Sequence, residues 1–463
     1  KGLEKSVHDA RSAQADEYSS WLRNAPMQSA GSAVIAPEAK AWTPQPLVPK
    51  VVFTGGLQDA MLEAATTVED RSSVRLDLRL IDPLGYASRP LEAARKATEA
   101  TMDVYGFGAC GPRGFYGTTR PHLDLEARIS KFLGMESAIV YSAGVATASS
   151  VIPALVQPGD RVIVDSEVHL GLRAGLRLCK CEVAWVPHGD VAAVEAALKR
   201  TGAADSKGKS ETRKQKTFIV AESLCQRTGR LAPLAELVAL KEKYGALLIL
   251  DETLSFGVFG DRGRGLLEVQ GIEPRRIDAI IGSLEHSVAA VGGFCAGRKG
   301  LIDHQRLSGS GYCFSAAAPP ASCAAADATI ADLEVGGAER RRSLRVSAER
   351  LHAEARKLAS SGGVPLELLS SPESFVQHLR WTGADAAEGE RKLLAAAELL
   401  KRGTEGVRIQ VCSPGACSAD ASFGARTGAP PAPAPSLRLC ASAEHSTEDI
   451  SSAMDALRRA LAV

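Results

Sequence analysis

The sequence predicts an α/β protein whose large, mostly parallel sheet is covered by helices on both faces. Two short apolar runs, Ala246–Leu250 and Ile277–Ile281, are bounded by glycine or charged residues, which is typical of buried parallel strands. Runs of this kind alternate with helical segments from about residue 74 to residue 325. A chain of 463 residues is long enough for about two to three domains. We therefore expect a large α/β domain followed by a smaller one.

Composition shifts divide the chain into three parts. Residues 1–73 are polar at first and then rich in proline and alanine, which predicts an N-terminal helix and an extended arm. Residues 74–325 form the large domain. Residues 326–463 form the small C-terminal α/β domain, which contains the low-complexity loop 412–435. The basic segment 201–216 indicates a solvated surface insertion, with a contact to anionic lipid as the alternative.

The charge and cysteine content exclude several classes of protein. The chain has 55 basic and 54 acidic residues and a net charge of +1, which argues against a nucleic-acid-binding surface. Its 10 cysteines show no spacing framework, so we expect reduced thiols rather than disulfides or a metal site. No apolar run reaches the roughly 18 residues needed to span a membrane.

The expected elements follow one another in a regular order. Each expected strand is a short apolar run, and each expected helix has apolar residues at helical spacing or follows a turn signal. The expected strands are 74–78, 138–141, 161–165, 183–186, 218–222, 246–250, 277–281, 375–380 and 436–440. The expected helices are 90–105, 191–200, 234–244, 339–358, 388–402 and 447–461, and two more begin near residues 122 and 142.

Two neighbouring strand ends carry the pattern of a cofactor site. Asp251 and Glu252 follow the strand at 246–250, and Gly282–His286 follows the strand at 277–281. A carboxylate at one strand end and a lysine at the next are one way to hold pyridoxal phosphate. The carboxylate keeps the pyridine nitrogen protonated, and the lysine forms an imine with the cofactor.

This stretch resembles the α-oxoamine synthases, a branch of the fold-type I pyridoxal-phosphate enzymes. Those enzymes read approximately Asp-Glu-Ala-His-Ser-x-Gly and then Thr-Phe-Ser-Lys, where this chain has Asp251–Gly257 and Ser283–His286. Leu254 stands at the position of the substrate-contacting histidine, and His286, which has no primary amine, stands at that of the lysine. The loss of both functions in an otherwise intact pattern is similar to the non-catalytic first subunits of serine palmitoyltransferases. The resemblance implies the fold-type I aminotransferase architecture.

Two further motifs are similar to those subunits. The Gly-rich stretch 108–118 matches nearly letter for letter, and the resemblance implies a loop at a dimer interface. The segment 304–320 matches the part of fold-type I dimers that crosses to the neighbouring subunit. There Ser315 occupies the place of a hydroxyl that hydrogen-bonds the partner's cofactor phosphate. A capping or turn serine before the Pro pair is the alternative.

The resemblance leaves open the role of several retained residues. The turn Ser142–Val145 corresponds to the phosphate-binding helix start, and we expect an empty or vestigial site there. His169 corresponds to the histidine that stacks on the pyridine ring, with a packed or interface histidine as the alternative. Arg438 corresponds to the arginine that binds the amino-acid carboxylate, with a structural ion pair as the alternative. Asp251 could persist through strand-end packing or ancestry.

The resemblance implies a heterodimer with a lysine-bearing second subunit that binds pyridoxal 5'-phosphate covalently. This complex would condense L-serine with palmitoyl-CoA to 3-ketosphinganine at the cytosolic face of the endoplasmic reticulum membrane, with the anchor outside this sequence and small membrane proteins as possible regulators. One alternative is a structural or regulatory scaffold without active-site atoms. Another is a self-sufficient synthase that uses a different amine, such as Lys299.

Overall fold

The computed structural model describes residues 74–204, 215–403, 406–413 and 433–462. These residues belong to one compact unit, Val52–Val463. The expected N-terminal helix and arm, most of the insertion at 201–216 and most of the loop at 412–435 lie outside the described residues.

A seven-stranded sheet forms the centre of the large domain, with strand order β2-β8-β7-β6-β5-β3-β4. Only β8 among these strands runs antiparallel to its neighbours, β2 and β7. The strands are β2 (Ser137–Tyr141), β3 (Arg161–Asp165), β4 (Glu182–Val186), β5 (Thr217–Glu222), β6 (Leu247–Asp251), β7 (Ala279–Ser283) and β8 (Gly293–Gly297). The predicted, mostly parallel sheet is confirmed.

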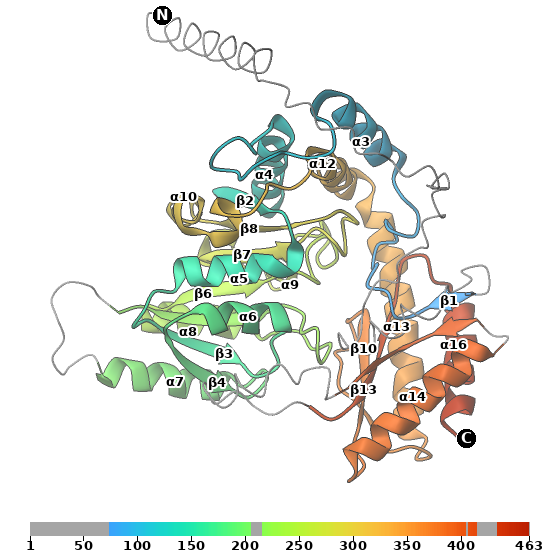
Figure 1. The fold of residues 1–463 in the computed structure, drawn as a ribbon. Coiled ribbons are helices and arrows are strands. Elements are labelled where there is room, and N and C mark those ends of the chain that lie inside the picture. Colours follow the sequence, from blue (N-terminus) through green and yellow to red (C-terminus); the bar gives the residue numbers. More distant parts are fainter. Residues whose placement is uncertain (1–73, 205–214, 404–405, 414–432, 463) are drawn as a thin grey trace, which may run out of the picture. The chain divides into compact units, whose positions relative to one another are not determined.

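Helices cover both faces of this sheet, as Figure 1 shows. Side chains alternate between the faces of a strand, so a strand with two covered faces must be apolar throughout. In β5, Phe218 and Val220 pack in the core beneath α5 and α6, whereas Ile219 and Ala221 pack in the core beneath α4, α7 and α8. The helices of this part are α3 (Glu92–Tyr105), α4 (Arg120–Leu133), α5 (Gly144–Leu155), α6 (Leu170–Leu178), α7 (Val191–Ala204), α8 (Leu234–Tyr244), α9 (Leu266–Val269), the 3-10 helix η2 (Pro274–Arg276), α10 (Lys299–Ser308), α11 (Ser310–Cys313) and α12 (Pro320–Val335).

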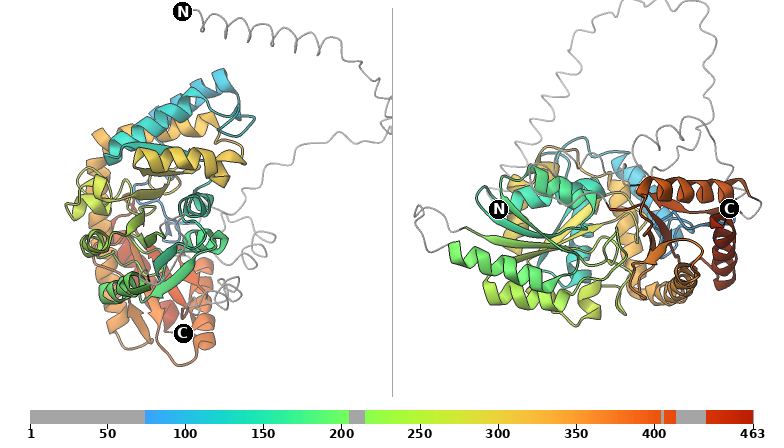
Figure 2. Two further views of the ribbon diagram at one scale, coloured as in Figure 1. Left: turned by 90° about the vertical axis from the view of Figure 1, so that its left-hand side faces the viewer. Right: turned by 90° about the horizontal axis from the view of Figure 1, so that it is seen from below.

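A second, antiparallel sheet forms the C-terminal part, with strand order β12-β13-β10-β9. Its strands are β9 (Leu366–Leu368), β10 (Val376–Trp381), β12 (Gln410–Cys412) and β13 (Ser436–Cys440). Helices α13 (Gly337–Ser360), α14 (Ala386–Arg402) and α16 (Thr447–Leu461) pack beside it (Figure 2). The short strand β1 (Leu76–Asp77) pairs with β11 (Val407–Arg408), so the start of the described chain is joined to this part.

The domain boundary predicted at residue 325 lies inside α12, and the chain changes direction at Gly336 between α12 and α13. Nine cysteines lie in the described residues, and all of them are free thiols. None of the described helices combines the length and the apolar character that a membrane crossing requires.

Candidate active site at the carboxyl edge of the sheet

The carboxyl ends of the parallel strands gather polar side chains at one edge of the large sheet. Strands β3, β5, β6 and β7 end in Asp165, Glu222, Asp251 and Ser283, respectively. The register pairs Glu222 directly with Asp251 across neighbouring strands. In open α/β sheets this edge is the usual place for a ligand. The structure therefore brings the predicted strand-end residues together.

Both carboxylate oxygens of Asp251 accept hydrogen bonds from groups of its own chain. Its Oδ2 accepts a hydrogen bond from His169 Nε2 at 3.0 Å, and its Oδ1 accepts one from the Thr253 N–H at 2.8 Å. The Asp251 side chain is only 3% exposed. His169 is therefore a partner of Asp251 and caps the start of α6, and its contact with a pyridine ring stays a prediction.

The surroundings of His169 fix the place of its ring proton. Burial would lower the pKa of His169, but the nearby carboxylates of Glu222 and Asp251 outweigh it and raise the pKa to about 9. The Gly171 N–H donates to Nδ1 at 3.0 Å, which opposes a second proton on that nitrogen. The raised pKa favours a doubly protonated ring at neutral pH, whereas the Gly171 contact favours an unprotonated Nδ1. Nε2 carries a proton in both states and points it toward Asp251.

Glu285 lies at the N-terminus of α5, where the resemblance places the phosphate-binding turn. The Gly144 N–H donates to Glu285 Oε1 at 3.2 Å. A Cβ atom on Gly144 would lie 2.8 Å from the carboxyl carbon of Glu285 and 2.7 Å from Ser283 Oγ. The space in front of this helix is therefore closely lined by side chains of the same chain.

His286, the residue at the lysine position, is partly buried beside the same edge. Burial lowers its pKa to about 4, with a further lowering by the positive charge of Arg438. Arg438 donates to the Arg79 carbonyl at 3.2 Å, and no carboxylate of the described residues lies within ion-pair distance of it. The ion pair considered for Arg438 is thus not found there. Leu254 is 4% exposed and packs in the core.

Lys299, the alternative amine, lies at the opposite edge of the sheet. Because β8 runs antiparallel, Gly297 pairs with Ala279 at the start of β7 rather than with its end. Lys299 follows Gly297 at the start of α10 and forms an ion pair with Asp303. Its amine is therefore directed away from the edge that holds Asp251.

A buried ion network holds the Gly-rich loop 108–118. Glu126 accepts hydrogen bonds from Arg113 at 2.8 Å and from the Val140 N–H at 3.0 Å, and its second oxygen lies 3.2 Å from Arg306. The guanidinium groups of Arg113 and Arg306 both lie over the Tyr312 ring. This network joins the loop to α4, β2 and the segment 304–320.

The tip of this loop is apolar and faces solvent in the single chain. Phe115 is 72% exposed and Tyr116 is 87% exposed, and Phe314 in the adjoining segment is 85% exposed. The Ala317 N–H donates to the Gly111 carbonyl at 2.9 Å, so the two segments are tied together. Exposed aromatic side chains on a fixed loop are typical of an interface.

Ser315, the predicted contact to a partner's cofactor phosphate, lies next to the helix start of its own chain. Its Oγ is 3.3 Å from Ser142 Oγ and 3.3 Å from the Ala316 carbonyl. Its side chain is therefore at the same edge as Gly144 and Glu285. The contact across an interface stays a prediction.

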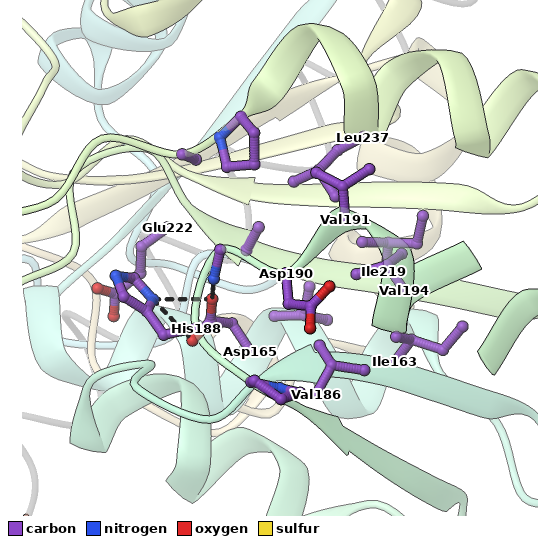
Figure 3. A pocket seen from close by; sticks show the side chains of 16 residues that line it. Ile163, Asp165, Val186, His188, Asp190, Val191, Val194, Ile219, Glu222 and Leu237 are labelled. Carbon is purple, nitrogen blue, oxygen red and sulfur yellow. Dashed lines mark hydrogen bonds and ion pairs between the residues drawn. The ribbon is translucent and has the colours of Figure 1, made fainter. Parts of the chain in front are cut away.

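A small cavity near Asp165 is not the cofactor site. Figure 3 shows it between β3, β5 and the helices α7 and α8, with mostly aliphatic walls. Its volume is about 30 Å³, which suits a water molecule but not a cofactor. Beside it His188 bonds Asp165 at 2.9 Å and Thr228 at 2.9 Å, which fixes the turn after β4.

Glu252, the second strand-end carboxylate, gives a prediction about pH. The residue is fully buried, and burial raises its pKa from 4.5 to about 7. The folded state holds the Glu252 proton more tightly than the unfolded state does. The resulting contribution to the free energy of unfolding is complete below pH 4.5 and is lost as the pH rises through about 7. Glu252→Gln should remove this loss, which is on the order of 3 kcal/mol. Urea unfolding of both proteins from pH 4.5 to pH 8 measures it, and equal pH slopes would contradict the assignment.

Sequence reasoning missed two functional features of this edge. It assigned no role to Glu285, although the position holds serine in the related Thr-Phe-Ser-Lys motif. It also did not foresee that His169 and Asp251 bond each other, because 82 residues separate them in the sequence. The signal for Glu285 was a carboxylate where the relatives have a hydroxyl.

Comparison with known proteins agrees with this architecture. The family model of aminotransferase class I and II matches residues 80–457. Long chain base biosynthesis protein 1b of Oryza sativa subsp. japonica is 37% identical over 366 residues, which are 78% of this chain and 73% of that protein. Serine palmitoyltransferase 1 of Dictyostelium discoideum is 35% identical over 346 residues, which are 73% of this chain and 70% of that protein.

A solved structure extends the likeness to three dimensions. Serine palmitoyltransferase from S. paucimobilis, solved with a bound PLP–myriocin aldimine, matches with a TM-score of 0.70 and 26% sequence identity. The match covers 83% of this chain and 86% of that one. The chain therefore belongs to the aminotransferase class I and II family and, within it, to the group of long chain base biosynthesis protein 1 and serine palmitoyltransferase 1.

Proposed function

We propose that this chain is the non-catalytic subunit of a heterodimeric serine palmitoyltransferase. The complex condenses L-serine with palmitoyl-CoA, releases CO₂ and CoA, and yields 3-ketosphinganine in the first step of sphingolipid synthesis. Membership in the serine palmitoyltransferase 1 group supports this reaction. The place of the complex is the cytosolic face of the endoplasmic reticulum membrane.

The residue three positions after the end of β7 carries the proposal. His286 stands there with a pKa lowered to about 4, and an imidazole cannot form the imine that the chemistry needs. Lys299 is directed to the other edge, which argues against a self-sufficient synthase. The lysine and the covalently bound pyridoxal phosphate therefore belong to a second subunit.

The surface around loop 108–118 is the proposed contact with that subunit. The buried network of Glu126 fixes the loop, and its aromatic tip needs a partner to be covered. The partner is a lysine-bearing chain of the same family. In the assembled enzyme this surface would complete the shared site for L-serine and palmitoyl-CoA, and small membrane proteins would regulate it.

Co-expression with a lysine-bearing second subunit tests the proposal. The two chains should purify together, and only the pair should release CoA from palmitoyl-CoA in the presence of L-serine. Each chain alone should give no product. Product formation by this chain alone, or full activity of the partner alone, would contradict the proposal.

A structural scaffold is the second candidate, because Ser315 hydrogen-bonds its own chain. If Ser315 instead reaches the partner's phosphate, Ser315→Ala should lower kcat/KM of the complex about tenfold, since it removes a hydrogen bond to a charged group. Ser361→Ala, at the end of α13 and outside segment 304–320, is the matched control and should have no effect. Unchanged turnover with intact assembly would favour the scaffold.

A further inference from the structure

Pyridoxal phosphate needs three anchors in a fold of this kind. They are an amine for the imine, a carboxylate for the ring nitrogen and an unoccupied helix start for the phosphate. The first is absent at His286. The other two depend on whether the chain leaves Asp251 and the N-terminus of α5 free for a ligand.

The phosphate anchor is taken by a side chain from another element. Helix α5 has no acidic residue in its first turn, and its N-cap residue Ala143 has no side chain that could cap it. The unpaired N–H groups of such a helix start favour an anion. Glu285 supplies one, because its carboxylate accepts the Gly144 N–H at 3.2 Å.

The same side chain fills the space that a phosphate would need. The approach to Gly144 is so close that even a Cβ atom would lie 2.8 Å from the Glu285 carboxyl group. A phosphate is larger than a methyl group and carries the same sign of charge as Glu285. Glu285 is exposed to solvent, so a phosphate could enter after this carboxylate had swung aside, and it would then meet like-charge repulsion.

The ring-nitrogen anchor already has partners in the same chain. Both oxygens of Asp251 already accept hydrogen bonds, from His169 at 3.0 Å and from the Thr253 N–H at 2.8 Å. Each carboxylate oxygen can accept a further hydrogen bond, so a pyridinium N–H would share Asp251 with His169. The amine is therefore absent, the helix start is already bonded by Glu285, and Asp251 is shared with His169.

We propose that Glu285 is a built-in substitute for the cofactor phosphate, so that this chain excludes pyridoxal phosphate even when an amine is supplied at residue 286. This goes beyond the missing lysine. A chain that lacked only the amine would regain the cofactor through His286→Lys alone. A chain whose phosphate place is filled would need Glu285 to be removed as well.

Four full-length variants separate these cases. They are His286→Lys, Glu285→Ser with His286→Lys, Glu285→Gln with His286→Lys, and a control that combines His286→Lys with Glu339→Ser. Glu339 is an exposed carboxylate in the first turn of α13, so its removal matches the charge change elsewhere. Each protein is incubated with pyridoxal phosphate, reduced with borohydride and digested. The pyridoxyl group on residue 286 is then measured by peptide mass.

We expect low labelling in His286→Lys and in the control. We expect about tenfold more labelling in the Glu285→Ser double variant, because the N-terminus of α5 can then bind the phosphate of the cofactor. The Glu285→Gln double variant removes the like charge but keeps the side-chain size. It should therefore gain less than the Glu285→Ser double variant but more than His286→Lys, so the test survives if the serine variant fails to fold. The proposal would be overturned if the folded double variants were labelled no more than His286→Lys. The labelling of residue 286 requires neither the second subunit nor turnover, so its failure would leave the proposed reaction untouched.

Discussion

Replacing Glu126 with alanine is expected to lower the free energy of unfolding by about 3–5 kcal/mol. Glu126 and Arg113 form an ion pair at 2.8 Å, and their side chains are only 7% and 3% exposed. Without the carboxylate, the Arg113 guanidinium stays buried without a counter-charge. The Val140 N–H also loses its acceptor. The midpoint of urea unfolding measures the loss.

An exposed carboxylate on the same helix is the control for this prediction. Asp124 pairs with Arg120 on α4, and their side chains are 45% and 74% exposed. Asp124→Ala should therefore change the free energy of unfolding by less than about 1 kcal/mol. Similar losses for Asp124→Ala and Glu126→Ala would contradict the assignment of the buried network as the support of loop 108–118.

Gly117→Ala is expected to lower turnover of the assembled enzyme about tenfold or more. A Cβ atom at Gly117 would lie 1.9 Å from the Gly111 carbonyl oxygen, so the loop backbone has to move. Overpacking of this kind costs about 1–3 kcal/mol and would shift the aromatic tip that we propose as the partner contact. Turnover and co-purification with the second subunit measure the effect.

Gly114, in the same loop, is the matched control for Gly117. A Cβ atom at Gly114 would meet no atom within 4 Å, and Gly114→Ala should leave assembly and turnover unchanged. If Gly117→Ala behaved like Gly114→Ala, the conformation of the loop would have no role in the complex. Since both changes add one methyl group, the difference between them reports backbone geometry alone.

Much of the fold could be predicted because local pattern and burial agree. Helix α8 (Leu234–Tyr244) was predicted with both of its ends, since Pro233 precedes it and Gly245 follows it. The parallel strands were found because both of their faces are covered and their runs are apolar throughout. Strand β8 was not found, because its run, Gly293–Gly297, begins and ends in glycine and has few large side chains.

The site could be predicted only in outline. The positions of Asp251 and His286 follow from strand ends that are near in sequence. In contrast, the contacts of Glu285 with Gly144 and of Arg306 with Glu126 join residues that are 141 and 180 positions apart. Such contacts depend on how the helices pack over the sheet, and no local pattern encodes them. The first places a carboxylate at the start of α5, and the second supports loop 108–118.

We propose that the chemistry of the complex depends on an amine that this chain does not supply. The mass of each subunit after borohydride reduction of the assembled, active enzyme tests it directly. We expect one pyridoxyl group per heterodimer, attached to the second subunit, and an unchanged mass for this chain. A pyridoxyl group on this chain, at Lys299 or any other lysine, would contradict it.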